Sequence, residues 1–164
     1  MLLVIELVWF QFYGMKLNLD LSKNPLDLRL GYSSQDVINY LTYRGEAGRD
    51  DYKFALSVID VIFPILYGLI LIIDVSKIAK KFFNSNPVVH LLFVSTPVGV
   101  VVFDLLENKN TLSMIAAFPN ITEDMAAKGS IYTLAKWSLG GLTALIIGYG
   151  IIKTRAMKRA RKKY

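Results

Sequence analysis

The sequence predicts an all-α integral membrane protein: a bundle of four transmembrane helices, with a short amphipathic helix on the outer side between the first two spans. Apolar residues make up 54% of the 164 positions, and the charged residues gather in a few segments. A membrane-spanning helix needs roughly 17–25 mostly apolar residues, because the hydrocarbon layer is about 30 Å thick. Four stretches that approach this length carry few charges, which favours a membrane as the solvent of this chain.

The predicted spans are marked by the residues at their ends. The second ends at Lys77, Lys80 and Lys81, and the third begins after Asn86-Pro87. The fourth is followed by a dense run of Lys and Arg, whereas the first is the shortest of the four. We place the spans at about residues 1–17, 54–76, 88–106 and 131–152, the outer segments at 18–53 and 107–130, and a basic cytoplasmic tail at 153–164, all within a single membrane domain over 1–164.

The distribution of Lys and Arg predicts the orientation, since positive loops tend to stay in the cytoplasm. The connection between the second and third spans is basic, and so is the C-terminal tail. The connection between the third and fourth spans carries Glu107, Glu123 and Asp124. Four spans place both termini on the cytoplasmic side, and the plasma membrane is the expected location. With a peripheral first stretch, three spans would put the termini on opposite sides.

The basic tail predicts contact with anionic lipids of the inner leaflet. Each Lys or Arg adds about 1 kcal/mol of binding free energy near a charged leaflet. Nucleic-acid binding would usually place aromatic residues or a folded motif among the charges. The one aromatic residue of the tail, Tyr164, follows the charges and does not stand among them, and no folded motif is apparent, so we expect a lipid bilayer and no nucleic acid as its partner.

The first outer segment contains the signals of a short helix. Ser33 and Asp36 have the spacing with which a hydroxyl and a carboxylate cap a first helical turn. The helix is expected over residues 34–43, with apolar residues at three- and four-residue steps, and Gly45 and Gly48 are expected to break it. In the second outer segment, residues 111–118 are apolar enough for a separate interfacial helix.

Four ionisable residues are predicted to form a cluster beneath the outer mouth of the bundle: Asp60, Asp104, Glu107 and Lys136. Each such residue in a span costs roughly 2.5–3.5 kcal/mol on insertion scales, so each marks a candidate site. The four lie at a similar depth in three different spans, and a Lys beside carboxylates is expected to pair with them because pairing lowers the cost of desolvation.

Four further polar residues complete the candidate ligand-binding set: Arg49, Tyr52, Tyr67 and Asn108. The first two precede the second span and are placed to act as lids over the cluster. Tyr67 falls on the same helical stripe as Asp60. Pro64 lacks an N–H, so the carbonyl of Asp60, four residues earlier, loses its helical partner and a kink opens room beside the carboxylate. Two interpretations stay open for this set: a binding or catalytic site, or polar contacts that fix the register of the helices.

Several chemistries are excluded by composition. The chain has no cysteine, which removes disulfides, thiol redox chemistry and thiolate metal sites. His90 is the single histidine, and about 14 residues of helix, roughly 20 Å, separate it from Asp104, so one metal ion cannot bind both. We expect no metal and no cofactor, and we expect His90 to lie at the inner membrane interface.

The chain resembles a group of small four-helix membrane proteins of bacterial type. The most distinctive part of this resemblance is the string Asp104-Leu105-Leu106-Glu107-Asn108. Further matching positions are Gly31-Tyr32-Ser33 with Asp36-Val37, Gly45, Gly48-Arg49 and Tyr52, Asp60 with Phe63-Pro64 and Tyr67, and Lys136-Trp137. The group has no assigned activity, so the resemblance implies an architecture and a set of polar positions but no reaction.

The functional expectation is a small multi-pass membrane protein that acts as a non-enzymatic accessory or scaffold subunit and packs against a membrane-protein partner or a second copy. No nucleotide-binding loop, nucleophile–base pair or metal-ligand set is apparent in the sequence. The alternative is a membrane enzyme or lipid-binding protein that uses the Asp/Glu/Lys cluster near the outer leaflet. Acid–base chemistry there would need pKa values shifted toward neutrality by burial and neighbouring charges.

Overall fold

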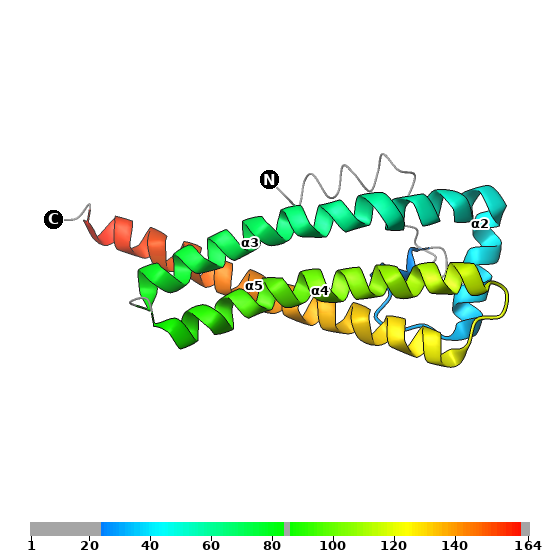
Figure 1. Cartoon of the computed structure of the whole chain (residues 1–164). Coiled ribbons are helices and arrows are strands. Elements are labelled where there is room, and N and C mark those ends of the chain that lie inside the picture. The colour runs from blue at the N-terminus through cyan, green and yellow to red at the C-terminus, as the bar shows by residue number, and fades with distance from the viewer. Residues whose placement is uncertain (1–23, 84–85, 162–164) are drawn as a thin grey trace. The chain divides into compact units, whose positions relative to one another are not determined.

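The computed structural model describes residues 24–83 and 86–161, and its regular elements are all helical (Figure 1). This confirms the all-α prediction. The elements are a short 3₁₀ helix η2 (Leu26–Leu28), α2 (Ser34–Phe54), a π-helical segment η3 (Ala55–Ile59), α3 (Asp60–Phe82), α4 (Pro87–Ala117) and α5 (Glu123–Arg161).

The prediction of a four-helix transmembrane bundle is wrong. In the described part of the chain, three helical runs are long and apolar enough to cross a membrane: Ser34–Phe82, Pro87–Ala117 and Glu123–Arg161. The predicted first span, residues 1–17, and the N-terminus lie outside the described residues. A helix over 1–17 would extend about 25 Å, less than the hydrocarbon thickness of about 30 Å. Of the four predicted spans, this one is therefore the least supported by its length.

The long helices continue well past the apolar stretches that predicted them. α4 has 31 residues and α5 has 39, whereas a span needs about 20. The separate interfacial helix predicted at residues 111–118 is instead the last part of α4. No Gly or Pro lies between Leu106 and Ala117, so nothing interrupts the helix until it ends just before Pro119.

α2 begins at the predicted cap and bends at the predicted glycine. The Ser33 hydroxyl accepts from the Asp36 N–H at 3.2 Å, and an Asp36 carboxylate oxygen accepts from the Ser33 N–H at 2.8 Å. The hydrogen bonds that the Asp36 carboxylate accepts from the Ser33 N–H and hydroxyl lower the pKa of Asp36 below its usual range. Gly45 has φ 67°, a left-handed conformation that favours glycine, and the helix kinks there. Gly48 remains helical, so the second predicted break does not occur.

The chain forms two compact units, which are described separately. The described part of unit 1 comprises residues 24–64 and 103–134, and that of unit 2 comprises residues 65–83, 86–102 and 135–161. Residues of α3, α4 and α5 belong to both units. The single-domain prediction over 1–164 stays a prediction.

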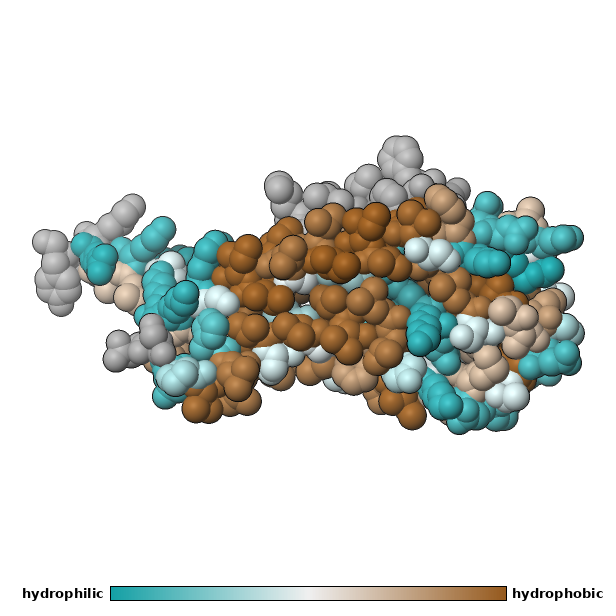
Figure 2. All heavy atoms as spheres, in the orientation of Figure 1, coloured by the Kyte–Doolittle hydropathy of each residue, from teal (hydrophilic) through white to brown (hydrophobic). Residues whose placement is uncertain are grey.

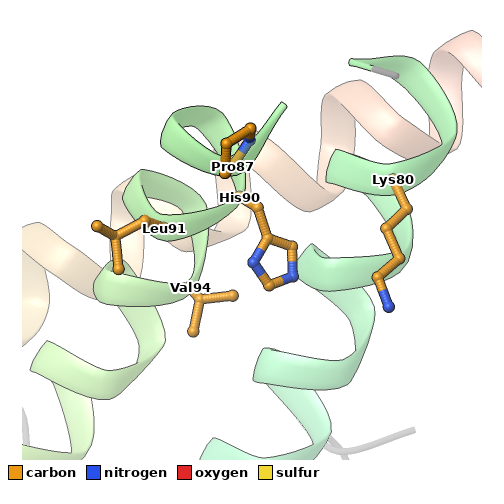
Figure 3. Close-up of a pocket in the computed structure, with 5 residues that line it drawn as sticks. All are labelled: Lys80, Pro87, His90, Leu91 and Val94. Carbon is orange, nitrogen blue, oxygen red and sulfur yellow. The ribbon is translucent and has the colours of Figure 1, made fainter. Parts of the chain in front are cut away.

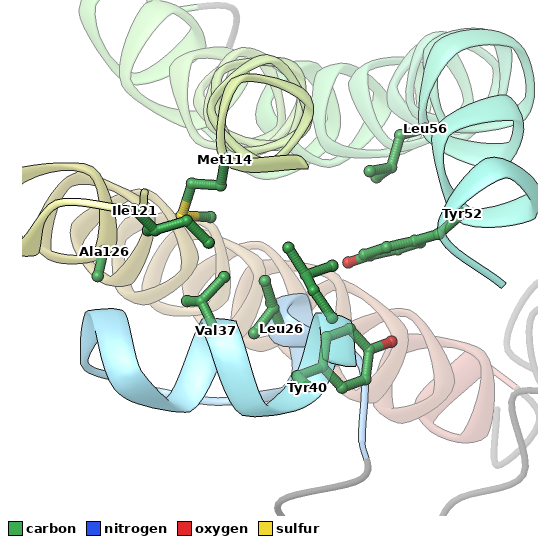
Figure 4. Packing of buried hydrophobic residues seen from close by; sticks show 9 residues of the cluster. Leu26, Val37, Tyr40, Tyr52, Leu56, Met114, Ile121 and Ala126 are labelled. Atoms are coloured by element: carbon green, nitrogen blue, oxygen red, sulfur yellow. The ribbon is translucent and has the colours of Figure 1, made fainter. Parts of the chain in front are cut away.

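Unit 1 has a buried hydrophobic core. Val37, Tyr40 and Leu41 of α2 are at most 1% exposed. They pack with residues of the other helices and of the chain before α2 (Figure 4). The remaining core residues are Leu26, Tyr52, Leu56, Met114, Ile121 and Ala126. The apolar side of α2, predicted from its spacing, is therefore the side that faces this core.

Unit 2 exposes many more of its large apolar side chains than unit 1 does. Large apolar side chains are exposed along all three of its helices, and on the face shown in Figure 2 they form a broad hydrophobic area over α3 and α4. Side chains of Val101, Leu139 and Ile78 occupy the positions where a Cβ would stand at Gly68, Gly99 and Gly150 respectively. Glycines at helix contacts, with apolar residues outside, are the packing expected of helices in a bilayer.

Polar groups also lie inside unit 2. Thr96 of α4 donates to the carbonyl of Phe93 at 2.9 Å, the carbonyl that Pro97 deprives of its helical partner. Thr143 of α5 lies 2.9 Å from the Thr96 hydroxyl, and both threonines are buried. A local hydroxyl thus replaces the missing helical bond, and a second hydroxyl joins the two helices.

Candidate functional site

The centre of the candidate site in unit 1 is the carbonyl of Asp60. Asn108 of α4 donates its side-chain N–H to this carbonyl at 2.7 Å. Pro64 removes the usual helical donor, and the helix enters this point through the π-helical segment η3. Asn108 is 5% exposed, so the amide supplies a bond that water would otherwise have to supply.

Glu107, the residue before Asn108, is 1% exposed. The hydroxyl of Thr133 on α5 makes a short hydrogen bond to a Glu107 carboxylate oxygen. The same hydroxyl lies 3.1 Å from the carbonyl of Gly129. A hydroxyl has one proton, so the two acceptors share it. This contact links α4 to α5 in the interior of unit 1.

A row of buried polar side chains on α4 extends this site. Thr111, one turn after Glu107 and Asn108, is 2% exposed. Asp104, one turn before Asn108, is half-buried, as is Asp60. Positions three and four apart share a helix face, so the polar residues of the Asp-Leu-Leu-Glu-Asn string are directed into unit 1, whereas Leu106 is exposed.

Tyr52 is a residue of the core of unit 1, and its predicted role as a lid stays a prediction. It is 2% exposed, and its ring meets that of Tyr40 edge to face at 5.8 Å. Burial, followed by the neighbouring Tyr40, raises the pKa of the Tyr52 hydroxyl well above its usual range. An aromatic residue just before a span can pack inward or cover a mouth, and the apolar surroundings supplied by α2 favour packing.

Arg49 reaches across the bend of α2. Its guanidinium lies 4.6 Å from the centre of the Phe118 ring and donates to the carbonyl of Leu41 at 3.1 Å. Gly45 turns the chain between these positions and brings the Arg49 side chain back toward the first half of α2. The Arg49 side chain therefore makes structural contacts with the first half of α2 and with Phe118.

The two other predicted members, Lys136 and Tyr67, belong to unit 2. Lys136 is 8% exposed, and its ammonium lies 5.8 Å from the centre of the Trp137 ring. Tyr67 is half-buried. The grouping of Lys136 and Tyr67 with the carboxylates of unit 1 stays a prediction.

Unit 1 also contains a group of arginine and tyrosine side chains that the sequence did not predict. The Tyr40 ring has the guanidinium of Arg29 at 5.1 Å and that of Arg44 at 5.7 Å, and Arg44 also lies 5.1 Å from the Tyr52 ring. Arg44 donates to the Tyr40 hydroxyl at 3.3 Å. The i to i+4 spacing of Tyr40 and Arg44 was the available signal.

A second feature that the sequence did not predict is the contact of the segment before α2, and of Ser34 at the start of α2, with the first part of α5. The backbone N–H of Tyr32 donates to the Ser130 hydroxyl at 3.0 Å, and the Ser34 hydroxyl donates to the Glu123 carboxylate at 2.6 Å. A Cβ at Gly129 would collide with the Tyr32 hydroxyl. These partners are about 90 or more positions apart in the chain, so no local pattern could identify them.

The arrangement connects helices through complementary polar groups: an amide with a proline-freed carbonyl, and a hydroxyl with a carboxylate. No group of three or more metal-ligating side chains occurs within residues 24–83 and 86–161. Comparisons of the chain with protein-family models, with curated proteins and with solved structures found no match. The fold and its three long apolar helices define the class as an all-α membrane protein.

Proposed function

We propose that this chain is a non-enzymatic accessory or scaffold subunit that packs against a membrane partner through one face of α5. The observation that carries the proposal is a set of small residues on α5 with unfilled space beside them. Among the residues that the structure describes, none comes within 4 Å of a Cβ built at Gly140, Gly141 or Gly148, and Ala144 between them is exposed. Small residues at such spacing let helix backbones approach closely inside a bilayer.

The other glycines of unit 2 provide the contrast that supports this proposal. Gly68, Gly99 and Gly150 each have a neighbouring side chain in the space of the missing Cβ. Within unit 2 as described, glycine thus marks helix contacts at three positions. The face with Gly140, Gly141 and Gly148 has the same residue type without a described neighbour, as a face reserved for another helix would.

The contacts in unit 1 support a non-enzymatic role. The amide of Asn108 and the hydroxyl of Thr133 each bond to a group of the protein itself, as residues that fix helix register do. Reacting groups would instead face a space large enough for a substrate. A role in helix register accounts for buried polar residues without a reaction.

For the location, we propose the plasma membrane, with the connection at residues 83–86 and the basic C-terminal tail on the cytoplasmic side. This placement rests on the Lys and Arg at that end of the helices. The opposite ends, including residues 24–53 and the turn at 118–122, then lie outside.

The test uses single cysteines, because the natural chain has none. Gly141→Cys and, as a control on α4, the exposed Ser95→Cys are each crosslinked in native membranes and sized on a denaturing gel. We expect Gly141→Cys, and not Ser95→Cys, to give one larger species. Gly141→Ile with Gly148→Ile should remove a partner that co-purifies with the wild type while leaving the melting temperature unchanged. Crosslinks at neither position, or equal crosslinks at both, would contradict the proposal.

A further inference from the structure

We propose that a depression between the end of α3 and the start of α4 binds the phosphate of an anionic phospholipid, whose acyl chain continues along α4. This site is independent of the α5 face proposed for a partner. Its polar lining is Lys80 and His90, and its apolar lining is Pro87, Leu91 and Val94 (Figure 3).

The two polar residues face the same hollow from different helices. In Figure 3 the His90 imidazole extends from the first turns of α4 toward α3, which carries the Lys80 side chain. An ammonium and an imidazole N–H are both donors to phosphate oxygens, and a charged donor makes the stronger bond.

The neighbouring basic side chains are already engaged. Lys77 lies 3.9 Å from Asp74, Lys81 donates to Thr154 at 2.9 Å, and Lys153 donates to Tyr149 at 2.7 Å. In contrast, neither the Lys80 ammonium nor the His90 imidazole bonds to any residue within 24–83 or 86–161. These two groups are therefore the ones available to an external anion.

The surroundings favour an anion with an apolar tail. Asp74 is the only acidic residue in the described part of unit 2, where Lys and Arg gather at this end of α3 and α5. Leu91 is 68% exposed, and the exposed Val98 and Val102 continue from it along α4. A free phosphate would use the donors alone, whereas a lipid would also cover this apolar track.

The position of the depression relative to the predicted membrane boundary agrees with a lipid-headgroup site. Lys80 stands four residues beyond the predicted inner end of its span, and His90 stands two residues inside the next predicted span. Basic pockets between transmembrane helices on the cytoplasmic side are known binding places for anionic headgroups. The N-terminus of α4 is not the donor here, because the Asn86 side chain accepts from its free N–H groups at 3.0 and 3.2 Å.

The experiment measures lipid adducts on the purified full chain by native mass spectrometry. The protein in detergent is titrated with phosphatidylglycerol, with phosphatidylcholine, and with inorganic phosphate as the tail-free anion. We expect one preferred phosphatidylglycerol adduct, which Lys80→Gln and His90→Gln each weaken about five- to tenfold. The matched control Lys77→Gln, which removes the same charge one turn away but lies outside the hollow, should change binding less than twofold.

Three outcomes would overturn the proposal. An equal loss with Lys77→Gln would mean diffuse attraction by the basic end and no defined site. Competition by inorganic phosphate at the concentration of the lipid would mean an anion site without a lipid. An equal preference for phosphatidylcholine would remove the role of charge. Because the readout is lipid bound to the monomer, failure of a partner to bind α5 leaves it unaffected.

Discussion

Units 1 and 2 differ in how far their large apolar side chains are buried, although α3, α4 and α5 contribute residues to both. Unit 1 encloses the apolar cluster around Val37, Leu41 and Met114. Unit 2 exposes Leu69, Leu145 and many similar residues. Because the hydrophobic effect requires water as the alternative environment, the core of unit 1 is stabilised by apolar burial, whereas the helices of unit 2 gain little from it in a bilayer.

The exposed apolar residues of unit 1 refine this comparison. Most of them fall within the predicted spans, as Phe54, Val58, Ile131 and Leu134 do. The core described above lies largely in the segments predicted to be outside the membrane. The change from helices with a buried apolar core to helices with exposed apolar side chains therefore follows the predicted membrane boundary.

The largest expected effect on stability compares the same substitution in the buried core of unit 1 and on the exposed apolar surface of unit 2. Leu41→Ala in the core of unit 1 should lower the free energy of unfolding by about 2–5 kcal/mol, through lost burial and the cavity left behind. Leu69→Ala, the same change at a 54% exposed position of unit 2, should cost about 0.5 kcal/mol or less. Chemical denaturation in detergent measures both, and equal costs would break the comparison.

The next effect concerns the polar contact at Asp60. Asn108→Leu removes the donor to the Asp60 carbonyl and should cost about 1–3 kcal/mol, because a buried acceptor is left unmatched. Pro64→Ala restores a helical N–H four residues after Asp60, so the cost of Asn108→Leu should be smaller in that background. A double-mutant cycle measures the difference. Additive costs would show that the amide does not replace the missing helical bond.

A smaller effect is expected at the cap of α2. Asp36→Asn should cost about 1 kcal/mol at neutral pH, since it removes the charged half of the capping box. The pKa of Asp36 is lowered in the folded chain, so the stability that it contributes is present above its unfolded pKa and is lost as pH falls through the folded value. Thermal melts of wild type and variant should converge in that acidic range. The exposed Asp51→Asn is the matched control and should leave the melting temperature unchanged.

The smallest effect belongs to the hydroxyl pair of unit 2. Thr143→Val keeps the shape of the side chain and removes its contact with Thr96. Hydrogen bonds between transmembrane helices contribute about 0.6 kcal/mol on average, so the free energy of unfolding should fall by about that amount. A cost several times larger would mean that the pair has a role beyond helix contact.

Local chemistry made part of this structure predictable. The Ser33–Asp36 cap, the break at Gly45 and the freed carbonyl of Asp60 each depend on residues within a few positions of one another, and each is present in the structure. The polarity of residues 107–110 predicts the end of a span but not the end of a helix, and because no helix-breaking residue lies there α4 continues to Ala117.

Long-range partners could not be predicted in the same way. Depth in the membrane indicated that Glu107 would be buried, but not that Thr133 would be its neighbour. The position of Tyr52 just before a span does not indicate its neighbour Tyr40, which the bend at Gly45 brings to it. Such contacts depend on how helices meet, and spacing along one helix carries no information about that.

The proposed division between helix surfaces that face lipid and surfaces that face water can be tested most directly with spin labels in bilayers. Labels at single cysteines replacing Leu69, Val98 and Leu145 of unit 2, and Asn39 and Ser113 of unit 1, report collision with oxygen and with a water-soluble nickel complex. We expect oxygen to dominate at the first three positions and the nickel complex at the last two. Equal accessibility to the nickel complex at Leu145 and Ser113 would contradict the account.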